Sequence, residues 1–250
     1  MELEQKSYYA HDEQYRTIAN KLWLENLYEE NDRKNLFQKM GFEDLFQRYQ
    51  KIIDVYIDLG CGGGYFLNRA SPYFKQVIGI EPSKAALESA AEINKYIKNI
   101  SYINLTMIEG MQLIPKHKPY LITTSAVLSH ITDEHVIKFL SYLNKTSPSG
   151  SALFFYEPFG KNIQTNLWHI RSKKWWHKNL QGWEVSFGSF QDSGYIKGIY
   201  ALKVNEKKRD DEHKIYNRYS FIVDDLAWIT EGIFYKLQYF FKRLISKFIL

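Results

Sequence analysis

Residues 52–64, Ile-Ile-Asp-Val-Tyr-Ile-Asp-Leu-Gly-Cys-Gly-Gly-Gly, join a β-branched apolar run directly to a glycine-rich loop. The run over residues 52–59 predicts a buried strand, and a helix over 65–70 is expected to follow the loop. Glycine lets the backbone turn sharply and approach a ligand without obstruction by a Cβ atom. The segment therefore predicts a ligand site at the carboxyl edge of a parallel sheet.

Strands and helices continue to alternate after this loop. Further elements are expected as strands over 76–80, 100–105, 120–124 and 151–156, and as helices over 83–96 and 133–145. Such alternation predicts right-handed βαβ units. After Pro158 it ends, and the runs 183–190 and 195–204 predict an antiparallel hairpin. The expected fold class is α/β: a Rossmann-like, doubly wound and mostly parallel sheet that ends in an antiparallel hairpin.

The chain of 250 residues is long enough for one sizeable α/β domain and hardly long enough for two. We expect a single domain over 1–250. In it, 1–50 form an N-terminal helical lid, 51–204 form the core, and 205–250 form a C-terminal helical extension. An insertion over 158–182 is expected to cover the substrate.

The composition restricts the class of protein. With 33 Lys and Arg against 28 Asp and Glu, the formal charge is +5, and a hydrophobic share of 45% is typical of a globular chain. Cys61 is the one cysteine, which excludes an intrachain disulfide and a Cys-built zinc site, and no metal is expected. The N-terminus lacks the features of a signal peptide, and no apolar run reaches the roughly 18 residues of a membrane span. We therefore expect a cytoplasmic protein.

Two positions indicate which ligand the glycine loop binds. The dinucleotide motif G-x-G-x-x-G needs glycine at position 65, where this chain has Tyr65. Asp58 precedes the first glycine, and a carboxylate there suits a cation better than a pyrophosphate. Glu81 follows the second predicted strand, 21 residues after Gly60, where a carboxylate can accept hydrogen bonds from ribose hydroxyls. Adenosine without phosphates, combined with positive charge, describes S-adenosylmethionine.

With these residues the chain resembles the class I S-adenosylmethionine-dependent methyltransferases. The match lies in residues 58–64 and 80–83, more loosely in 125–131, and extends over about residues 52–156. The resemblance implies an enzyme whose cofactor is S-adenosylmethionine, with glycines at its methionine end, a glutamate at the ribose and another glutamate at the adenine. The cofactor-binding residues implied are Asp58, Gly60, Gly62, Gly64, Glu81, Glu109 and Ser125.

The N-terminal segment resembles the lid that many small-molecule methyltransferases fold over the cofactor. The resemblance implies that Arg16 pairs with the methionine carboxylate and that Tyr15 lies beside it. Tyr9 and His11 are expected to contact the acceptor. The alternative is that Tyr15 only packs and that Arg16 is solvated.

Methyl transfer from a sulfonium is an in-line displacement, so the enzyme supplies alignment and, for a hydroxyl or ammonium acceptor, a base. We expect the acceptor over the carboxyl ends of strands four and five. His130 is the first candidate base, because an unperturbed imidazole titrates near pH 7, and its alternative role is structural. Glu157 either binds an acceptor hydroxyl or amine or anchors the turn. His169 is a third catalytic candidate.

Residues 161–178 carry five basic and no acidic side chains. Tryptophan faces stack on sugars or bases, and cations attract phosphate. The substrate-binding candidates here are Trp168, Arg171 and Trp175. They indicate an anionic or phosphate-bearing small molecule, with O-methylation of a sugar or nucleotide-linked sugar as the expected function. The alternative is a solvated basic helix whose Trp side chains pack on the sheet.

Residues 233–250 carry four basic and no acidic side chains, with apolar residues at helical spacing. Such a helix packs on its own domain, docks on a second copy in a homodimer, or makes peripheral contact with an anionic membrane. An alternative function is therefore methylation of a lipid-linked or membrane-bound acceptor. A nucleic-acid-binding methyltransferase is less favoured, because no Asn-Pro-Pro-Tyr type of sequence follows the fourth strand, and no specific nucleic acid is expected as a partner.

Overall fold

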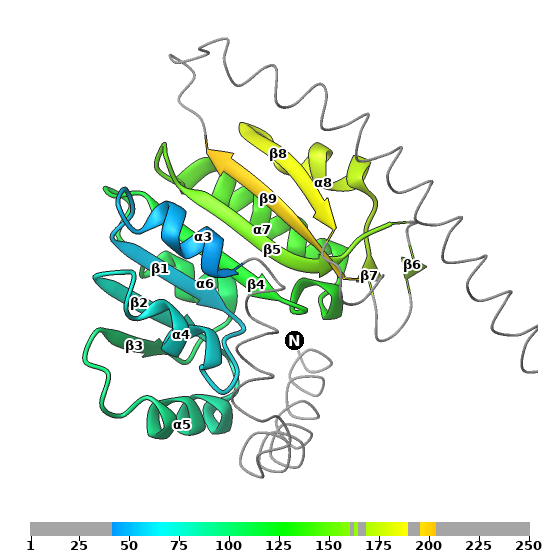
Figure 1. Cartoon of the computed structure of the whole chain (residues 1–250). Helices are drawn as coiled ribbons and strands as arrows, with labels where there is room; N and C mark the ends of the chain where they lie inside the picture. Colours follow the sequence, from blue (N-terminus) through cyan, green and yellow to red (C-terminus); the bar gives the residue numbers. More distant parts are fainter. Residues whose placement is uncertain (1–41, 161–162, 165–168, 190–195, 204–250) are drawn as a thin grey trace, which may run out of the picture. The chain divides into compact units, whose positions relative to one another are not determined.

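The computed structural model describes residues 42–160, 163–164, 169–189 and 196–203 (Figure 1). Their strands form a seven-stranded sheet in the order β3-β2-β1-β4-β5-β9-β8 and a separate two-stranded ladder, β6-β7. The strands are β1 Val55–Leu59, β2 Gln76–Ile80, β3 Ile100–Ile103, β4 Tyr120–Ser125, β5 Ala152–Pro158, β6 Ile163–Gln164, β7 His169–Ile170, β8 Trp183–Ser189 and β9 Ile196–Lys203.

The large sheet is parallel from β3 to β5 and antiparallel beyond. β9 runs antiparallel to both of its neighbours, β5 and β8. This confirms the mostly parallel sheet with an antiparallel hairpin. The direction in which strands are added reverses between β1 and β4, and such a switch point is where open α/β sheets bind ligands. Asp58 lies here, opposite Gly79 of β2 and Thr123 of β4.

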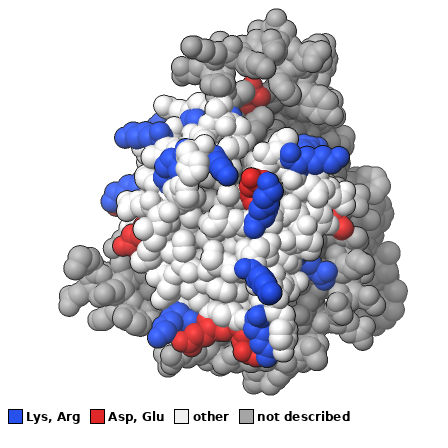
Figure 2. All heavy atoms as spheres, turned by 90° about the vertical axis from the view of Figure 1, so that its left-hand side faces the viewer, with Lys and Arg blue, Asp and Glu red and all other residues white. Residues whose placement is uncertain are grey.

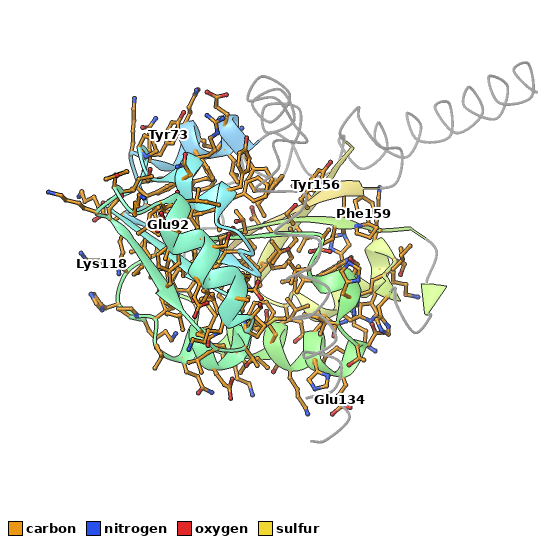
Figure 3. The ribbon with its side chains drawn as sticks, turned by 90° about the horizontal axis from the view of Figure 1, so that it is seen from below. Tyr73, Glu92, Lys118, Glu134, Tyr156 and Phe159 are labelled. Carbon is orange, nitrogen blue, oxygen red and sulfur yellow. The ribbon has the colours of Figure 1, made fainter. Side chains whose placement is uncertain are left out.

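Helices cover both faces of the sheet (Figure 1). Those on one face, α3 to α5, share an apolar cluster with it, and those on the other face, α6 to α8, share a second cluster. Figure 3, viewed from below, shows the side chains that fill the space between sheet and helices. The helices are α3 Phe42–Tyr49, α4 Tyr65–Ala70, α5 Lys84–Ile93, α6 Met107–Gln112, α7 Asp133–Thr146 and α8 Lys173–Asn179, with a 3₁₀ turn, η1 Leu128–His130.

The alternation of side chains along β1 explains the two clusters. Tyr56 packs against the rings of Phe46 and Phe74, with centroids 4.9 and 5.4 Å away. Ile57 and Leu59 are fully buried in the cluster of the opposite face. Because successive strand residues point to opposite faces, and both faces are covered, the strand is apolar almost throughout.

Some boundaries differ from those expected. β1 begins at Val55, because the amides of Ile52 and Ile53 both bond to the carbonyl oxygen of Tyr49 and continue the turn after α3. The helix α6 was not predicted, although Met107, Ile108 and Met111 stand at helical spacing after the capping residue Thr106. By contrast, α4 has the bounds expected from the sequence, since its glycine loop and the following Ser71-Pro72 mark both of its ends.

Several predicted features lie outside the described residues. They include Tyr9, His11, Tyr15 and Arg16 of the expected lid, Trp168, and the extension over 205–250. Among the helices that are described, none is long and apolar enough to cross a membrane.

The side of the molecule shown in Figure 2 carries scattered charge. Lys and Arg side chains lie there among uncharged residues, some of them beside Asp or Glu. This side of the described part therefore has no continuous basic surface of the kind that attracts a phosphate backbone.

Candidate functional site

The glycine loop lies between the end of β1 and the start of α4. Gly60, Gly62 and Gly64 all have positive φ angles, of 69°, 48° and 76°. A Cβ atom at Gly60 would lie 2.5 Å from Val127, in the segment after β4. The amide of Gly60 donates to the carbonyl oxygen of Ile80 at 2.8 Å. The loop therefore requires glycine and is held against both neighbouring strands.

We expect Gly60→Ala to lower the free energy of unfolding by about 2 kcal/mol, because the left-handed backbone and the contact with Val127 both oppose a Cβ atom. Gly63→Ala is the matched control, since no atom lies within 4 Å of a Cβ at that position. Urea denaturation of the cofactor-free protein measures both variants. Equal losses would contradict the steric explanation.

Glu81 follows β2 and holds the loop from its side. Its carboxylate accepts hydrogen bonds from the amides of Gly62 at 3.2 Å and Ser83 at 3.0 Å. Asn104, after β3, donates its side-chain amide to the carbonyl oxygen of Glu81 at 3.0 Å. The carboxylate is thus fixed beside the glycine loop, in a residue that is only 7% exposed.

Asp58 is buried at the end of β1. Its Oδ1 accepts a hydrogen bond from the Thr123 hydroxyl at 3.1 Å, and that hydroxyl lies 2.6 Å from the hydroxyl of Tyr56. Its Oδ2 has no hydrogen-bond partner among the described residues. Burial raises the pKa of Asp58 to about 8. The hydrogen bond from Thr123 lowers this pKa, and the negative charge of Glu81 raises it further. A cation placed at Oδ2 would relieve this burial cost.

Glu157 lies at the end of β5 and is 1% exposed. Its Oε1 accepts hydrogen bonds from the Thr124 hydroxyl and the amides of Val127 and Leu128, at 2.8, 2.8 and 2.9 Å. Its Oε2 accepts one from the amide of Ser129 at 3.1 Å. Burial raises the pKa of Glu157, and these hydrogen bonds oppose the rise. The contacts fit the second of its two expected roles, an anchor of the turn.

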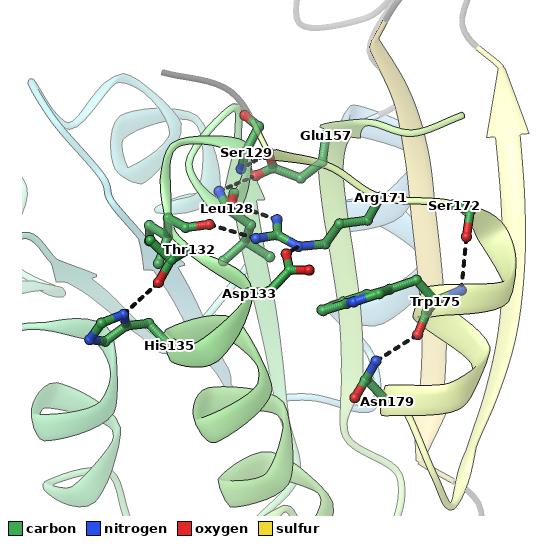
Figure 4. Close-up of polar contacts among 11 residues, drawn as sticks. Leu128, Ser129, Thr132, Asp133, His135, Glu157, Arg171, Ser172, Trp175 and Asn179 are labelled. Carbon is green, nitrogen blue, oxygen red and sulfur yellow. Dashed lines mark hydrogen bonds and ion pairs between the residues drawn. The ribbon is translucent and has the colours of Figure 1, made fainter. Parts of the chain in front are cut away.

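Arg171 lies on the other side of the same turn and is also 1% exposed (Figure 4). Its guanidinium donates to the carbonyl oxygens of Leu128 and Ile131, at 2.7 and 2.5 Å, and to the carboxylate of Asp133 at 2.8 Å. It lies 4.9 Å from the ring centroid of Trp175. These contacts direct the guanidinium into the protein. The structure thus gives Arg171 a bracing role that the sequence does not predict.

The tryptophans of α8 also point inward. Trp176 is 1% exposed, and its ring centroid lies 5.9 Å from that of Phe155 in the sheet. Trp175 is partly buried, with its ring 5.1 Å from that of Trp176. This arrangement favours the alternative of a basic helix that packs its Trp side chains on the sheet. An acceptor contact of Trp175 stays a prediction.

His130 and His169 come from segments far apart in sequence. His130 ends η1 and is exposed, and His169 lies in β7 and is partly exposed. Burial lowers the pKa of His169, the charges of Arg171 and His130 lower it further, and Asp133 opposes them. The strand β7, which carries His169, packs against η1, which ends at His130.

The structure gives Glu109 a local role. It is exposed on the first turn of α6, and its carboxylate accepts hydrogen bonds from the hydroxyl and the amide of Thr106, at 2.7 and 3.2 Å. This is the arrangement of a capping residue, so an adenine contact of Glu109 stays a prediction. Ser125 ends β4, opposite Tyr156 and at the same carboxyl edge as Asp58.

Tyr56 and Thr123 belong to the site but were missed by sequence reasoning. A signal for Tyr56 was present, because residues two apart in a strand share a face and Tyr56 therefore lies on the face of Asp58. Thr123 depends on the register between β1 and β4, which pairs it with Asp58. No pattern in the sequence predicts that register.

Comparison with known proteins identifies similar chains. A family model described as a methyltransferase domain matches residues 14–199. The chain is 27% identical over 130 residues to the "Probable S-adenosylmethionine-dependent methyltransferase CRG1" of Saccharomyces cerevisiae. That match covers 50% of this chain and 44% of the yeast protein, so the chain spans less than half of its relative.

Solved structures share the fold at low sequence identity. The DhpI–SAH complex has a TM-score of 0.58 and 13% identity, over 78% of this chain and 96% of that one. Phosphoethanolamine N-methyltransferase 1 of Haemonchus contortus, in complex with phosphoethanolamine and S-adenosylhomocysteine, has a TM-score of 0.58 and 16% identity, over 84% of this chain and 51% of that one.

Proposed function

The chain belongs to the class I S-adenosylmethionine-dependent methyltransferases, and on that premise we propose that its acceptor is a small, phosphate-bearing molecule. The first candidates are hydroxyls of a sugar or of a nucleotide-linked sugar. The observation that carries the proposal is the packing of β7, which carries His169, against η1, which ends at His130. Arg171 of the positively charged insertion holds this turn through two of its carbonyl groups.

We propose that Asp58, Glu81 and the loop of Gly60, Gly62 and Gly64 hold the cofactor. S-adenosylmethionine supplies a methyl group on a positively charged sulfur when it is bound. The buried Oδ2 of Asp58, which has no hydrogen-bond partner among the described residues, suits positive charge. Glu81 stands where a carboxylate receives ribose hydroxyls. These three glycines have positive φ angles and carry no Cβ atom, so the backbone of the loop can approach a ligand closely.

Positive charge on α8, the helix that follows β7 in the chain, supports an anionic acceptor. α8 carries Lys173, Lys174 and Lys178 and no acidic residue. The ammonium of Lys173 lies 5.9 and 5.6 Å from the ring centroids of Phe159 and Phe187, which follow or belong to β5 and β8. Cations attract phosphate. The Haemonchus contortus neighbour binds phosphoethanolamine, a small phosphate ester, which is consistent with the same acceptor class here.

In this proposal His169 takes the proton that an acceptor hydroxyl loses. Its lowered pKa keeps the imidazole neutral near pH 7, and only a neutral ring can accept a proton. The acceptor oxygen forms its bond to the methyl carbon as the carbon–sulfur bond breaks, and the proton passes to a ring nitrogen. His130, at the end of η1 against which β7 packs, helps to align the acceptor.

The test is methyl transfer from radiolabelled cofactor to a nucleotide sugar, a sugar phosphate, phosphoethanolamine and, as control, an unphosphorylated sugar. We expect transfer to a phosphorylated acceptor only. His169→Asn is expected to lower kcat by about 100-fold without changing the affinity for S-adenosylhomocysteine. Absence of transfer to every phosphorylated small molecule would refute the proposal.

A lipid-linked acceptor is the second candidate, and the basic, apolar residues over 233–250 favour it. Flotation with anionic vesicles tests it on the full chain. A double variant, Lys242→Glu with Arg243→Glu, is expected to lose vesicle binding if this segment makes the contact. Equal flotation of both proteins would remove the candidate.

A further inference from the structure

The turn after β4 is held from both of its ends by opposite charges (Figure 4). The carboxylate of Glu157 receives the amides at its start, and the guanidinium of Arg171 donates to the carbonyl oxygens at its end. The signs match the dipole of the turn, which is positive at its amide end and negative at its carbonyl end. The backbone before it is constrained too, since Ala126 has a φ of 55°.

The backbone of Arg171 fixes the insertion at the same place. Phe159 and Arg171 form a β-bridge, and the amide of Gly160 donates to the carbonyl oxygen of Arg171 at 3.1 Å. The ladder β6-β7, in which Gln164 pairs with His169, belongs to the segment that this bridge closes into a loop. Arg171 therefore joins the strand that carries His169 to the turn that carries His130.

We infer that Arg171 and Glu157 are positioning residues, which together set His130 and His169 side by side. The inference rests on the proposed function, in which these imidazoles face the acceptor. A buried charge that merely stabilised the fold could be replaced by apolar packing at little or no cost. Here both charges instead fix the path of the turn that includes the exposed His130, and Arg171 stands two residues after His169 in the chain.

The experiment measures the pKa of His169 by NMR of ring-labelled histidine in four proteins. They are the wild type, His130→Asn, Arg171→Lys and the double variant. Loss of the His130 charge is expected to raise the pKa of His169 in the wild type, where Arg171 and Asp133 also act on it. Lysine keeps the positive charge but cannot reproduce the planar fork that reaches two carbonyl groups. In the Arg171→Lys background, we therefore expect His130→Asn to leave the pKa of His169 unchanged.

Two controls separate positioning from general damage. Binding of S-adenosylhomocysteine by the Arg171→Lys protein is expected to stay within about twofold of wild type, because the glycine loop and Glu81 are untouched. Arg69→Lys changes an arginine of α4 that lies over the ring of Tyr65. We expect it to leave intact the coupling between the two histidines, which is the effect of His130→Asn on the pKa of His169. Glu157→Gln, which keeps the shape of the side chain and removes the charge, should weaken the coupling as Arg171→Lys does.

The inference would be overturned if His130→Asn shifted the pKa of His169 equally in the wild-type and Arg171→Lys backgrounds. It would also be overturned if His130→Asn did not shift that pKa in the wild type. Loss of cofactor binding by Arg171→Lys would overturn it too, since Arg171 would then serve the whole fold. Failure of the proposed function gives a different result. The coupling would behave as expected, while the wild-type enzyme transferred no methyl group to a phosphorylated acceptor.

Discussion

Glu81→Ala is expected to weaken the binding of S-adenosylhomocysteine by at least about 100-fold, or roughly 2.7 kcal/mol. The substitution removes the carboxylate proposed to receive the ribose hydroxyls. It also leaves the amides of Gly62 and Ser83 without the acceptor that now fixes them, so the glycine loop loses its anchor on the side of β2. Unmet buried donors cost about 1–3 kcal/mol each, which adds to the loss. Isothermal titration calorimetry measures the affinity.

Glu92→Ala is the matched control for this prediction. Glu92 is an exposed glutamate of α5, and its carboxylate accepts a hydrogen bond from Lys95 at 2.6 Å. We expect its replacement to change cofactor affinity by less than about threefold. If Glu92→Ala weakened binding as strongly as Glu81→Ala, the assignment of the ribose to Glu81 would fail.

Asp58→Asn is expected to stabilise the cofactor-free protein and to weaken cofactor binding. The pKa of Asp58 is raised from 3.8 to about 8 in the folded chain, so between these values the folded protein keeps a proton that the unfolded chain has released. Stability therefore falls as pH rises through this window, by up to about 1.4 kcal/mol per pH unit. Asparagine carries no charge, so at pH 8 we expect a gain of up to about 5 kcal/mol in the free energy of unfolding.

Binding a cation should drive that proton off. In the wild type, we expect the affinity for S-adenosylmethionine to rise with pH up to about 8 and protons to be released on binding, as calorimetry in two buffers of different ionisation enthalpy would show. In Asp58→Asn, affinity should be about tenfold lower at pH 8 and independent of pH. A wild-type protein that released no proton on binding would contradict the role given to Asp58.

Sequence reasoning succeeded where chemistry is local. Tyr65 excluded the dinucleotide motif, and Asp58 and Glu81 flank a glycine loop that the structure places at the switch point of the sheet. The runs on either side of residues 190–195 likewise pair as two antiparallel strands, as expected. These features depend on neighbours in the chain or on strand order, and both leave a pattern in the sequence.

It failed where a side chain finds its partner through the fold. Arg171 was expected to reach the acceptor because it lies among basic and aromatic residues, but the structure brings it to carbonyl groups 40 and 43 residues away. Glu157 left two roles open for the same reason. A glutamate at the end of a strand gives the same sequence pattern in both cases, whether its carboxylate binds a substrate or accepts hydrogen bonds from three backbone amides.

The bridge between Phe159 and Arg171 has a consequence for how such enzymes diversify. The insertion leaves the core at Phe159 and returns to it at Arg171, and these two residues are adjacent in space. The segment between them is therefore a loop whose two ends are fixed next to each other. The entropy of closing a loop grows only slowly with its length. A loop of different length or composition could therefore replace the segment between Phe159 and Arg171. Such a replacement would alter the acceptor preference and leave the residues proposed to bind the cofactor unchanged.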